Sequence, residues 1–220
     1  MDVSAMDAFL AEQRERATRT GDPIEWQVLA ETCLERVLLE AAPMGMAVGR
    51  PVFAKRPEIV DTLLADGLQA ITEVRDLGRR HSEVGRIAAG LLANKIDGAL
   101  AAMRYGRQVD AFLSEAEAFA DGNPHIAVAR GCRLLFAPRW LGGDPERALN
   151  LFESAAHALP EDERPLVFAA FAAHLQGDVA RAQRSLRDAV ACNPDNAYAR
   201  EVLRRIQAGE ADVFGRSLDG

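Results

Sequence analysis

The stretch from Gly143 to Pro194 reads GDPERALNLFESAAHALPEDERPLVFAAFAAHLQGDVARAQRSLRDAVACNP and contains one pattern written twice. Its landmarks recur at a single offset of 34 residues: Gly143-Asp144 and Gly177-Asp178, Ala148 and Ala182, Phe152 and Leu186, Ala155 and Ala189, Pro160 and Pro194. This offset is the length of a repeat that consists of two antiparallel helices and a turn. So many matches at one offset are hard to obtain by chance, and the stretch therefore predicts repeated helical hairpins.

The residues between these landmarks predict how the hairpins pack. Ala148, Phe152, Ala155 and Leu159 lie at positions i, i+4, i+7 and i+11, which is one side of a helix. Small residues on that side let a neighbouring helix approach closely, and Phe152 or Leu186 fills the remaining space. The Gly-Asp pair ends one helix and begins the next, because glycine adopts a left-handed backbone and Asp accepts hydrogen bonds from free helix N–H groups.

The composition is that of a soluble globular protein. Its 220 residues, 49% hydrophobic and 27% charged, can form one elongated domain or two small ones with a substantial core. The net charge of −7 argues against nucleic acid as a partner. The acidic start Met1–Ser4 shows no signal peptide, and no stretch approaches the ~20 apolar residues of a membrane span. We therefore expect a cytoplasmic protein.

Helical periodicity and breaking residues predict an all-α chain with about ten helices and no strand. Outside the repeated stretch we expect helices over residues 4–19, 23–42, 57–77, 83–102, 107–120, 124–137 and 196–208. Ser82 is the expected cap of the helix over 83–102, and Pro138 should end the helix before it. We expect residues 1–123 to be a diverged helical-repeat or bundle region that contains the loop 43–56. Residues 124–208 are expected to hold the repeats with a final capping helix, and residues 209–220 a loose, flexible tail.

Residues 43–56 are the least regular part of the chain. They contain two prolines, two glycines, two methionines, Phe53 and the cations Arg50, Lys55 and Arg56. Loops of this length are uncommon in helical arrays. The segment is either a connector that packs against the helices, a lid over a groove, or an arm for a partner.

The segment 124–208 resembles tetratricopeptide repeat proteins. The likeness is strongest in the second helix of the two units; the first helix of the second unit keeps small residues (Ala169, Ala170, Ala173) but lacks the family's usual Trp, Gly and Tyr. The resemblance implies a helical-hairpin solenoid, an α–α superhelix. Such a fold implies a scaffold for protein–protein interaction.

A local variant of the pattern is similar to the T-component family of TRAP transporters and to other bacterial helical-repeat proteins. It consists of Pro138, Gly142-Gly143-Asp144, Arg147-Ala148, Phe152-Glu153 and Ala156. Members of that transporter family are exported lipoproteins, whereas an export signal and a lipid-attachment cysteine are not visible here. The resemblance covers about a third of the chain.

In tetratricopeptide repeat proteins the first helix of each unit lines a concave groove. By position, the resemblance assigns to this groove Arg130, Arg133 and Trp140 of the first unit, Arg164, Val167, Phe171 and His174 of the second, and Tyr198, Glu201 and Arg205 of the last helix. Arginines among aromatic rings suit an acidic or carboxylate-bearing peptide. Alternatively, these arginines are the solvated side of alanine-rich helices. The family's carboxylate-clamp binders need Lys and Asn where Arg133 and Ala137 stand, so no specific peptide class follows.

Residue patterns for catalysis or metal binding are absent. The four histidines share no metal-ligand spacing, and Cys33, Cys132 and Cys192 fit neither a disulfide framework nor a Cys-x-x-Cys site. Nucleophile, Walker and dinucleotide motifs are missing. We therefore expect no enzyme, no metal and no cofactor.

Two functional hypotheses follow. The first is a tetratricopeptide-like scaffold that binds a protein or peptide, with acidic groups where the arginines face it, through its concave side. The alternative is an accessory small-molecule binding or delivery subunit, as in TRAP T-components, with an apolar cavity in the N-terminal helices roofed by residues 43–56. The oligomeric state does not follow from the sequence.

Overall fold

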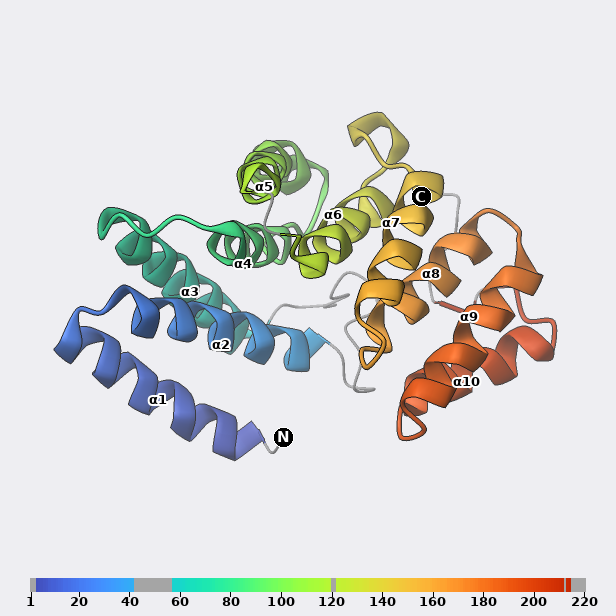
Figure 1. Ribbon diagram of the computed structural model, residues 1–220, viewed down its shortest axis with the longest axis horizontal. Helices are drawn as coiled ribbons and strands as arrows, with labels where there is room; N and C mark the ends of the chain where they lie inside the picture. The colour runs from blue at the N-terminus through green and yellow to red at the C-terminus, as the bar shows by residue number, and fades with distance from the viewer. Residues whose placement is uncertain (1–2, 42–56, 120–121, 212, 215–220) are drawn as a thin grey trace. The chain divides into compact units, whose positions relative to one another are not determined.

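The computed structural model describes residues 3–41, 57–119, 122–211 and 213–214, and their regular structure is entirely helical (Figure 1). The helices are α1 (Val3–Thr20), α2 (Pro23–Ala41), α3 (Glu58–Asp76), α4 (Ser82–Ala93), α5 (Ala99–Ala118), α6 (Pro124–Phe136), the 3-10 turn η1 (Arg139–Leu141), α7 (Pro145–Ala158), α8 (Arg164–Leu175), α9 (Val179–Cys192) and α10 (Ala197–Gln207). The prediction of an all-α fold of helical hairpins is confirmed. The loop 43–56 lies outside the described residues.

The chain divides into two compact units. The described part of the first unit ends at Ile126, and the second begins at Ala127, within α6. Each unit has its own hydrophobic core. The sequence pattern had suggested a division after residue 123.

In the first unit, α1 packs on α2, α2 on α3, and α4 on α5. Its core consists of aliphatic residues of these helices, among them Leu29, Val37, Leu64, Val74, Ile87 and Leu91. Glycines bring the helices together: a Cβ on Gly85 would lie 2.8 Å from the carbonyl oxygen of Phe112 on α5. Gly85 therefore lets α4 approach the backbone of α5 closely, although the bounds predicted for this helix are wrong.

The helices predicted over 83–102 and 107–120 are instead divided between residues 94 and 98. Asn94 ends α4, where its side-chain Nδ2 donates to the Gly90 carbonyl at 2.9 Å, and Gly98 precedes α5 in an extended conformation. The break follows from the polar, turn-forming stretch Asn94–Gly98, which the pattern of small residues had masked. Ser82 is the first residue of α4, and the capping position belongs to His81.

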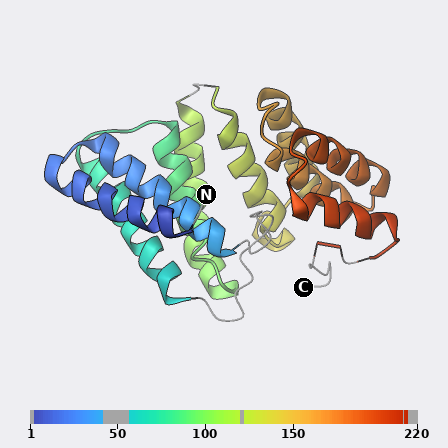
Figure 2. The ribbon, with the colours of Figure 1, turned by 90° about the horizontal axis from the view of Figure 1, so that it is seen from below.

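The second unit contains the repeated stretch, as successive antiparallel helices from α7 to α10 (Figure 2). The Asp residues of the pattern cap helices as predicted: Asp144 Oδ1 accepts from the Arg147 N–H at 3.0 Å, and Asp178 Oδ1 from the Arg181 N–H at 2.9 Å. Asn196 does the same at the start of α10, where it accepts from the Ala199 N–H at 2.9 Å.

Two glycines, Gly142 and Gly143, precede Asp144, whereas one glycine, Gly177, precedes Asp178. Gly142 and Gly177 have left-handed backbones, with φ of 86° and 78°. Gly143 is needed for a different reason, because a Cβ there would lie 1.9 Å from the Ala137 carbonyl oxygen. The match of Gly143 with Gly177 therefore holds in sequence position but not in conformation.

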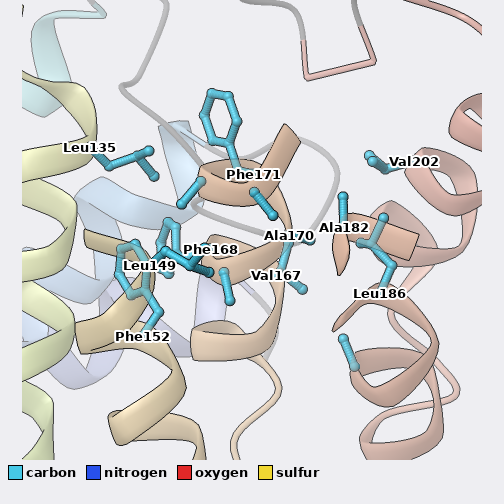
Figure 3. Packing of buried hydrophobic residues seen from close by; sticks show 14 of the residues in the cluster. Leu135, Leu149, Phe152, Val167, Phe168, Ala170, Phe171, Ala182, Leu186 and Val202 are labelled. Atoms are coloured by element: carbon cyan, nitrogen blue, oxygen red, sulfur yellow. The ribbon is translucent and has the colours of Figure 1, made fainter. Parts of the chain in front are cut away.

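The buried stripe of the repeat is confirmed for Ala148, Phe152 and Ala155, whereas Leu159 is the C-cap of α7 and is half-buried. Phe152 and Leu186 are fully buried, and so are the alanines of the pattern. The Phe152 ring stacks on Phe168 with centroids 5.2 Å apart, and the two rings lie together in Figure 3. The edge of the Phe152 ring lies directly over Gly131 of α6, where a Cβ would lie 2.6 Å from a ring carbon.

Pro138 interrupts the chain as expected. Helix α6 ends at Phe136, and η1 follows as one 3-10 turn. Main-chain bonds close this turn, with Gly143 N donating to Pro138 O and Asp144 N to Leu134 O. The turn therefore ties the start of α7 back to α6.

Among the helices of the described ranges, none is both long and apolar enough to cross a membrane. The three cysteines are free, and Cys33 is fully buried. Burial raises the pKa of the Cys33 and Cys132 thiols to about 12.

The stacking of Phe152 predicts a large loss of stability on truncation. Phe152→Ala leaves a cavity between Gly131 and Phe168 and should lower the free energy of unfolding by about 3–5 kcal/mol. Trp140→Ala is the matched aromatic control in the same unit, because Trp140 is 66% exposed; its effect should stay within about 0.5 kcal/mol. Urea denaturation followed by circular dichroism measures both, and equal losses would contradict the assigned core.

The capping aspartates predict a smaller, local effect. Asp178→Ala removes the acceptor for the Arg181 N–H and should destabilise the protein by about 1 kcal/mol. Asp188→Ala, on the exposed side of the same helix, is the control and should be close to neutral. Thermal melting distinguishes the two variants; a neutral Asp178→Ala would show that the cap contributes nothing.

Candidate functional site

The chain reverses direction after α10 and returns over the repeat. Gly209 has a left-handed backbone with φ of 77°. Its N–H donates to Ile206 O at 3.0 Å and the N–H of Glu210 donates to Arg205 O at 3.1 Å, which is the Schellman arrangement of a helix end. The residues after it, which we call the return segment (residues 210–214, described except for residue 212), are thereby directed back toward α8 and α10.

An aromatic contact fixes the return segment to α8. The ring of Phe214 stacks on Phe171 with centroids 4.5 Å apart and 16° between the planes. The His174 ring lies 5.4 Å from the same phenyl group, at 54°. Phe171 itself contacts Phe136 of α6, with centroids 5.7 Å apart, and projects from α8 away from the Phe152–Phe168 pair (Figure 3). Two aromatic residues of α8 therefore hold one phenyl ring.

Side chains of α8 and α10 bind the main chain of the return segment. His174 Nε2 lies 2.9 Å from the carbonyl oxygen of Ala211; since a carbonyl only accepts, this nitrogen carries the proton. Arg205 Nη1 donates to the carbonyl oxygen of Val213 at 3.0 Å. The two carbonyls are two residues apart and are bound from two different helices.

An ion pair completes the contact. Arg205 Nε donates to Glu210 Oε2 at 2.6 Å, with the two side chains 32% and 41% exposed. Val213 is buried in the core of the second unit. We call the surface made by Phe171, His174, Tyr198 and Arg205 the α8–α10 face.

Tyr198 belongs to this face because it precedes Arg205 by two helical turns. It is half-buried against the core. Burial raises the pKa of the Tyr198 phenol to about 12, against the opposing effect of the Arg205 charge. The phenol is therefore a neutral donor and acceptor at the edge of the face at physiological pH.

The α8–α10 face carries groups of the kind that bind polypeptides. It offers donors to main-chain carbonyls, which every peptide carries, an aromatic site for a ring, and a guanidinium for a carboxylate. Four of the residues assigned by resemblance to the groove, namely Phe171, His174, Tyr198 and Arg205, lie on it. Phe171 is not open to solvent as the prediction implied, because Phe214 covers it.

The other predicted groove residues have local partners or are buried. Arg133 Nη2 donates to Leu141 O at 3.1 Å and thereby holds η1. Arg164 makes a two-pronged contact with Asp162, at 2.8 and 2.7 Å. Val167 is fully buried in the core, which corrects its assignment to an open surface.

Three further predicted groove residues are not among the four that define the α8–α10 face. Arg130 is half-buried on α6, Trp140 is exposed on η1, and Glu201 binds Arg204 on α10 with distances of 2.9 and 2.7 Å. Glu201 therefore uses its carboxylate within its own helix.

Sequence reasoning missed the return segment itself. Residues 209–220 were expected to be a loose tail, but Val213 and Phe214 pack on the second unit, while residues 215–220 lie outside the described range. Two signals could have indicated the contact. Gly209 follows the last helix as Gly177 follows α8, and an apolar Val213-Phe214 pair stands in an otherwise polar end.

A separate hollow of about 250 Å³ lies between α7, α8 and α9. Its rim carries an ion pair in which Arg181 donates to both oxygens of Glu153, at 2.8 and 2.6 Å. The Glu153 carboxylate raises the pKa of the Arg181 guanidinium. In the described part of the chain, no cluster of His, Cys, Asp and Glu residues could hold a metal ion.

Comparison with known families agrees with the geometry of the second unit. Residues 140–206, from η1 to α10, match the family model of the tetratricopeptide repeat. This segment belongs to the tetratricopeptide repeat family. The comparisons with curated proteins and with solved structures found no match. The similarity of residues 138–156 to TRAP T-components stays a prediction.

The burial of Tyr198 predicts that its phenol loses its proton only at unusually high pH. Since the folded pKa is about 12 and the ordinary value is 10.0, the folded protein holds this proton more tightly than the unfolded chain. The stability that results is complete below pH 10 and is lost as the pH rises towards 12.

Ultraviolet absorbance of the phenolate measures this effect as the difference between the wild type and Tyr198→Phe. The difference curve should have its midpoint near 12, and melting temperatures should fall more steeply between pH 10 and 12 in the wild type. A midpoint near 10 would place Tyr198 in solvent instead.

Proposed function

We propose that the tetratricopeptide repeats of this chain bind a polypeptide partner through the α8–α10 face. Tetratricopeptide repeats serve in general as scaffolds for protein–protein interaction. One observation supports the choice of this face: its side chains bind two main-chain carbonyls, a phenyl ring and a carboxylate of the return segment.

The helices that carry the face support the same proposal. In tetratricopeptide repeat proteins the first helices of successive units line the concave groove, and α8 and α10 are first helices here. Contacts of the return segment run to these two helices, through His174 of α8 and Arg205 of α10. Arg130 and Arg133 of α6, Trp140 of η1 and Arg164 of α8 stay candidates for an extension of this surface.

The charge of the face favours acidic groups in the partner. Arg205 is the guanidinium that binds a carboxylate of the return segment. A net charge of −7 makes nucleic acid an unfavourable partner for the whole chain. The alternative function, a small-molecule delivery subunit, stays a prediction, because the loop 43–56 proposed as its roof lies outside the described residues.

A photo-cross-linking amino acid at position 198 tests the proposed face. In cells of the source organism, p-benzoylphenylalanine at Tyr198 should give a discrete polypeptide adduct. The same amino acid at Arg187, exposed on α9, is the positional control and should give none.

A neighbouring pair of arginines provides the matched charge control. Arg205→Glu, combined with the cross-linker at position 198, should reduce the adduct at least tenfold, because it replaces the attraction for carboxylates with repulsion. Arg204→Glu alters the adjacent residue, which pairs with Glu201, and should leave the adduct intact. Equal yields from positions 198 and 187, or equal yields from the two charge variants, would refute the assignment of the face.

A further inference from the structure

We propose that the return segment is a built-in occupant of the α8–α10 face, and that the partner displaces it with a segment of the same chemistry. That chemistry is a Glu followed four residues later by a Phe, with main-chain carbonyls between them that can accept hydrogen bonds. The inference rests on the proposed function and adds to it the class of ligand and the competition that controls access.

The main-chain contacts show that the segment is held as a peptide ligand is held. His174 and Arg205 donate to the carbonyls of Ala211 and Val213, and these contacts do not depend on which side chains the bound residues carry. The main-chain carbonyls of a second polypeptide are acceptors of the same kind. The return segment and a partner segment therefore compete for the same donors.

The side-chain contacts define what a competitor must carry. The phenyl ring of Phe214 occupies a site between Phe171 and His174, where stacking adds to the burial of apolar surface. The Glu210 carboxylate meets the Arg205 guanidinium. The same Arg205 also donates to the carbonyl of Val213, the residue before Phe214. One side chain therefore binds both the Glu210 carboxylate and the main chain next to the Phe214 ring.

The geometry of the chain favours exchange over permanent closure. The segment is joined to α10 by the single turn at Gly209, so it competes as a tethered ligand with an effective concentration on the order of millimolar. Its ion pair is partly exposed, at 32% and 41% of the two side chains, and contributes little to affinity. A free peptide should therefore bind the wild type weakly and bind a chain with a weakened segment more tightly.

The test uses full-length proteins and a labelled synthetic peptide with the sequence of residues 208–214, AGEADVF. Fluorescence anisotropy should show that Phe214→Ala binds this peptide at least tenfold more tightly than the wild type does. Phe119→Ala removes a phenyl group that is 40% exposed in the first unit, and serves as the matched control with wild-type affinity. The same peptide with Phe replaced by Ala should lose its binding to Phe214→Ala.

Glu210→Gln gives an independent readout if Phe214→Ala proves unstable. It changes only a partly exposed carboxylate, so the fold is retained, and the peptide should bind several-fold more tightly than to the wild type. Combining Phe214→Ala with Arg205→Gln should weaken binding of the peptide several-fold relative to Phe214→Ala, because the peptide then loses both the ion pair and the donor to its main-chain carbonyl.

Three results would overturn the inference. If Phe214→Ala and Glu210→Gln, folded by circular dichroism, bind the peptide no better than the wild type, the segment is a structural clamp. If every protein, Phe119→Ala included, binds equally, the peptide uses another surface. A concentration-dependent dimer of the wild type that Phe214→Ala abolishes would assign the segment to a neighbouring copy.

The result of the peptide assay can be distinguished from the result of the cross-linking test of the proposed function. Arg205-dependent cross-linking from position 198 together with an unresponsive peptide assay would leave the face as a partner site and remove only the exchange. Peptide binding without any cellular adduct would retain the exchange site and remove the assigned partner role.

Discussion

The second unit depends on the close approach of helices whose facing residues are small. Phe152 can be fully buried only because Gly131 of α6 has no side chain beneath its ring, and because alanines on α7 and α8 leave room for the neighbouring backbone. A methyl group at Gly131 would overlap the ring at 2.6 Å, and dense interiors do not absorb such overlap without strain. Packing of the large and small residues thereby fixes the spacing of the helices, and with it the separation of the donors on α8 and α10.

The return segment covers an aromatic side chain of α8, Phe171. Phe171 projects from α8 on the side away from Phe152, and in the structure it is only 2% exposed because Phe136 and Phe214 cover it. Without Phe214 an aromatic residue of α8 would face water, which is unfavourable but is also what a binding surface requires. The same contact covers an apolar ring in the folded chain and, under the proposed exchange, restricts access of a partner to the face.

Period and capping could be predicted from the sequence because they depend on local chemistry. The 34-residue offset, the Asp caps and the break at Pro138 each follow from a few neighbouring residues, and all are present. The division at Asn94–Gly98 was missed because a run of small residues looked like continuous helix. The return segment was missed because its position depends on a contact between Phe214 and Phe171, 43 residues apart, which no local rule reports.

The candidate site shows why residue type alone could not decide its chemistry. Four arginines were assigned to the groove as if equivalent, yet Arg133 holds the Leu141 carbonyl and Arg164 holds Asp162 beside it. Arg205 differs because the carboxylate it binds lies on a segment that follows the helix rather than within the repeat. In the proposed exchange, its charge is engaged by a group that a partner can replace. Under that proposal, specificity comes from the spacing of one guanidinium, one imidazole and one aromatic ring on α8 and α10, and not from the number of positive charges.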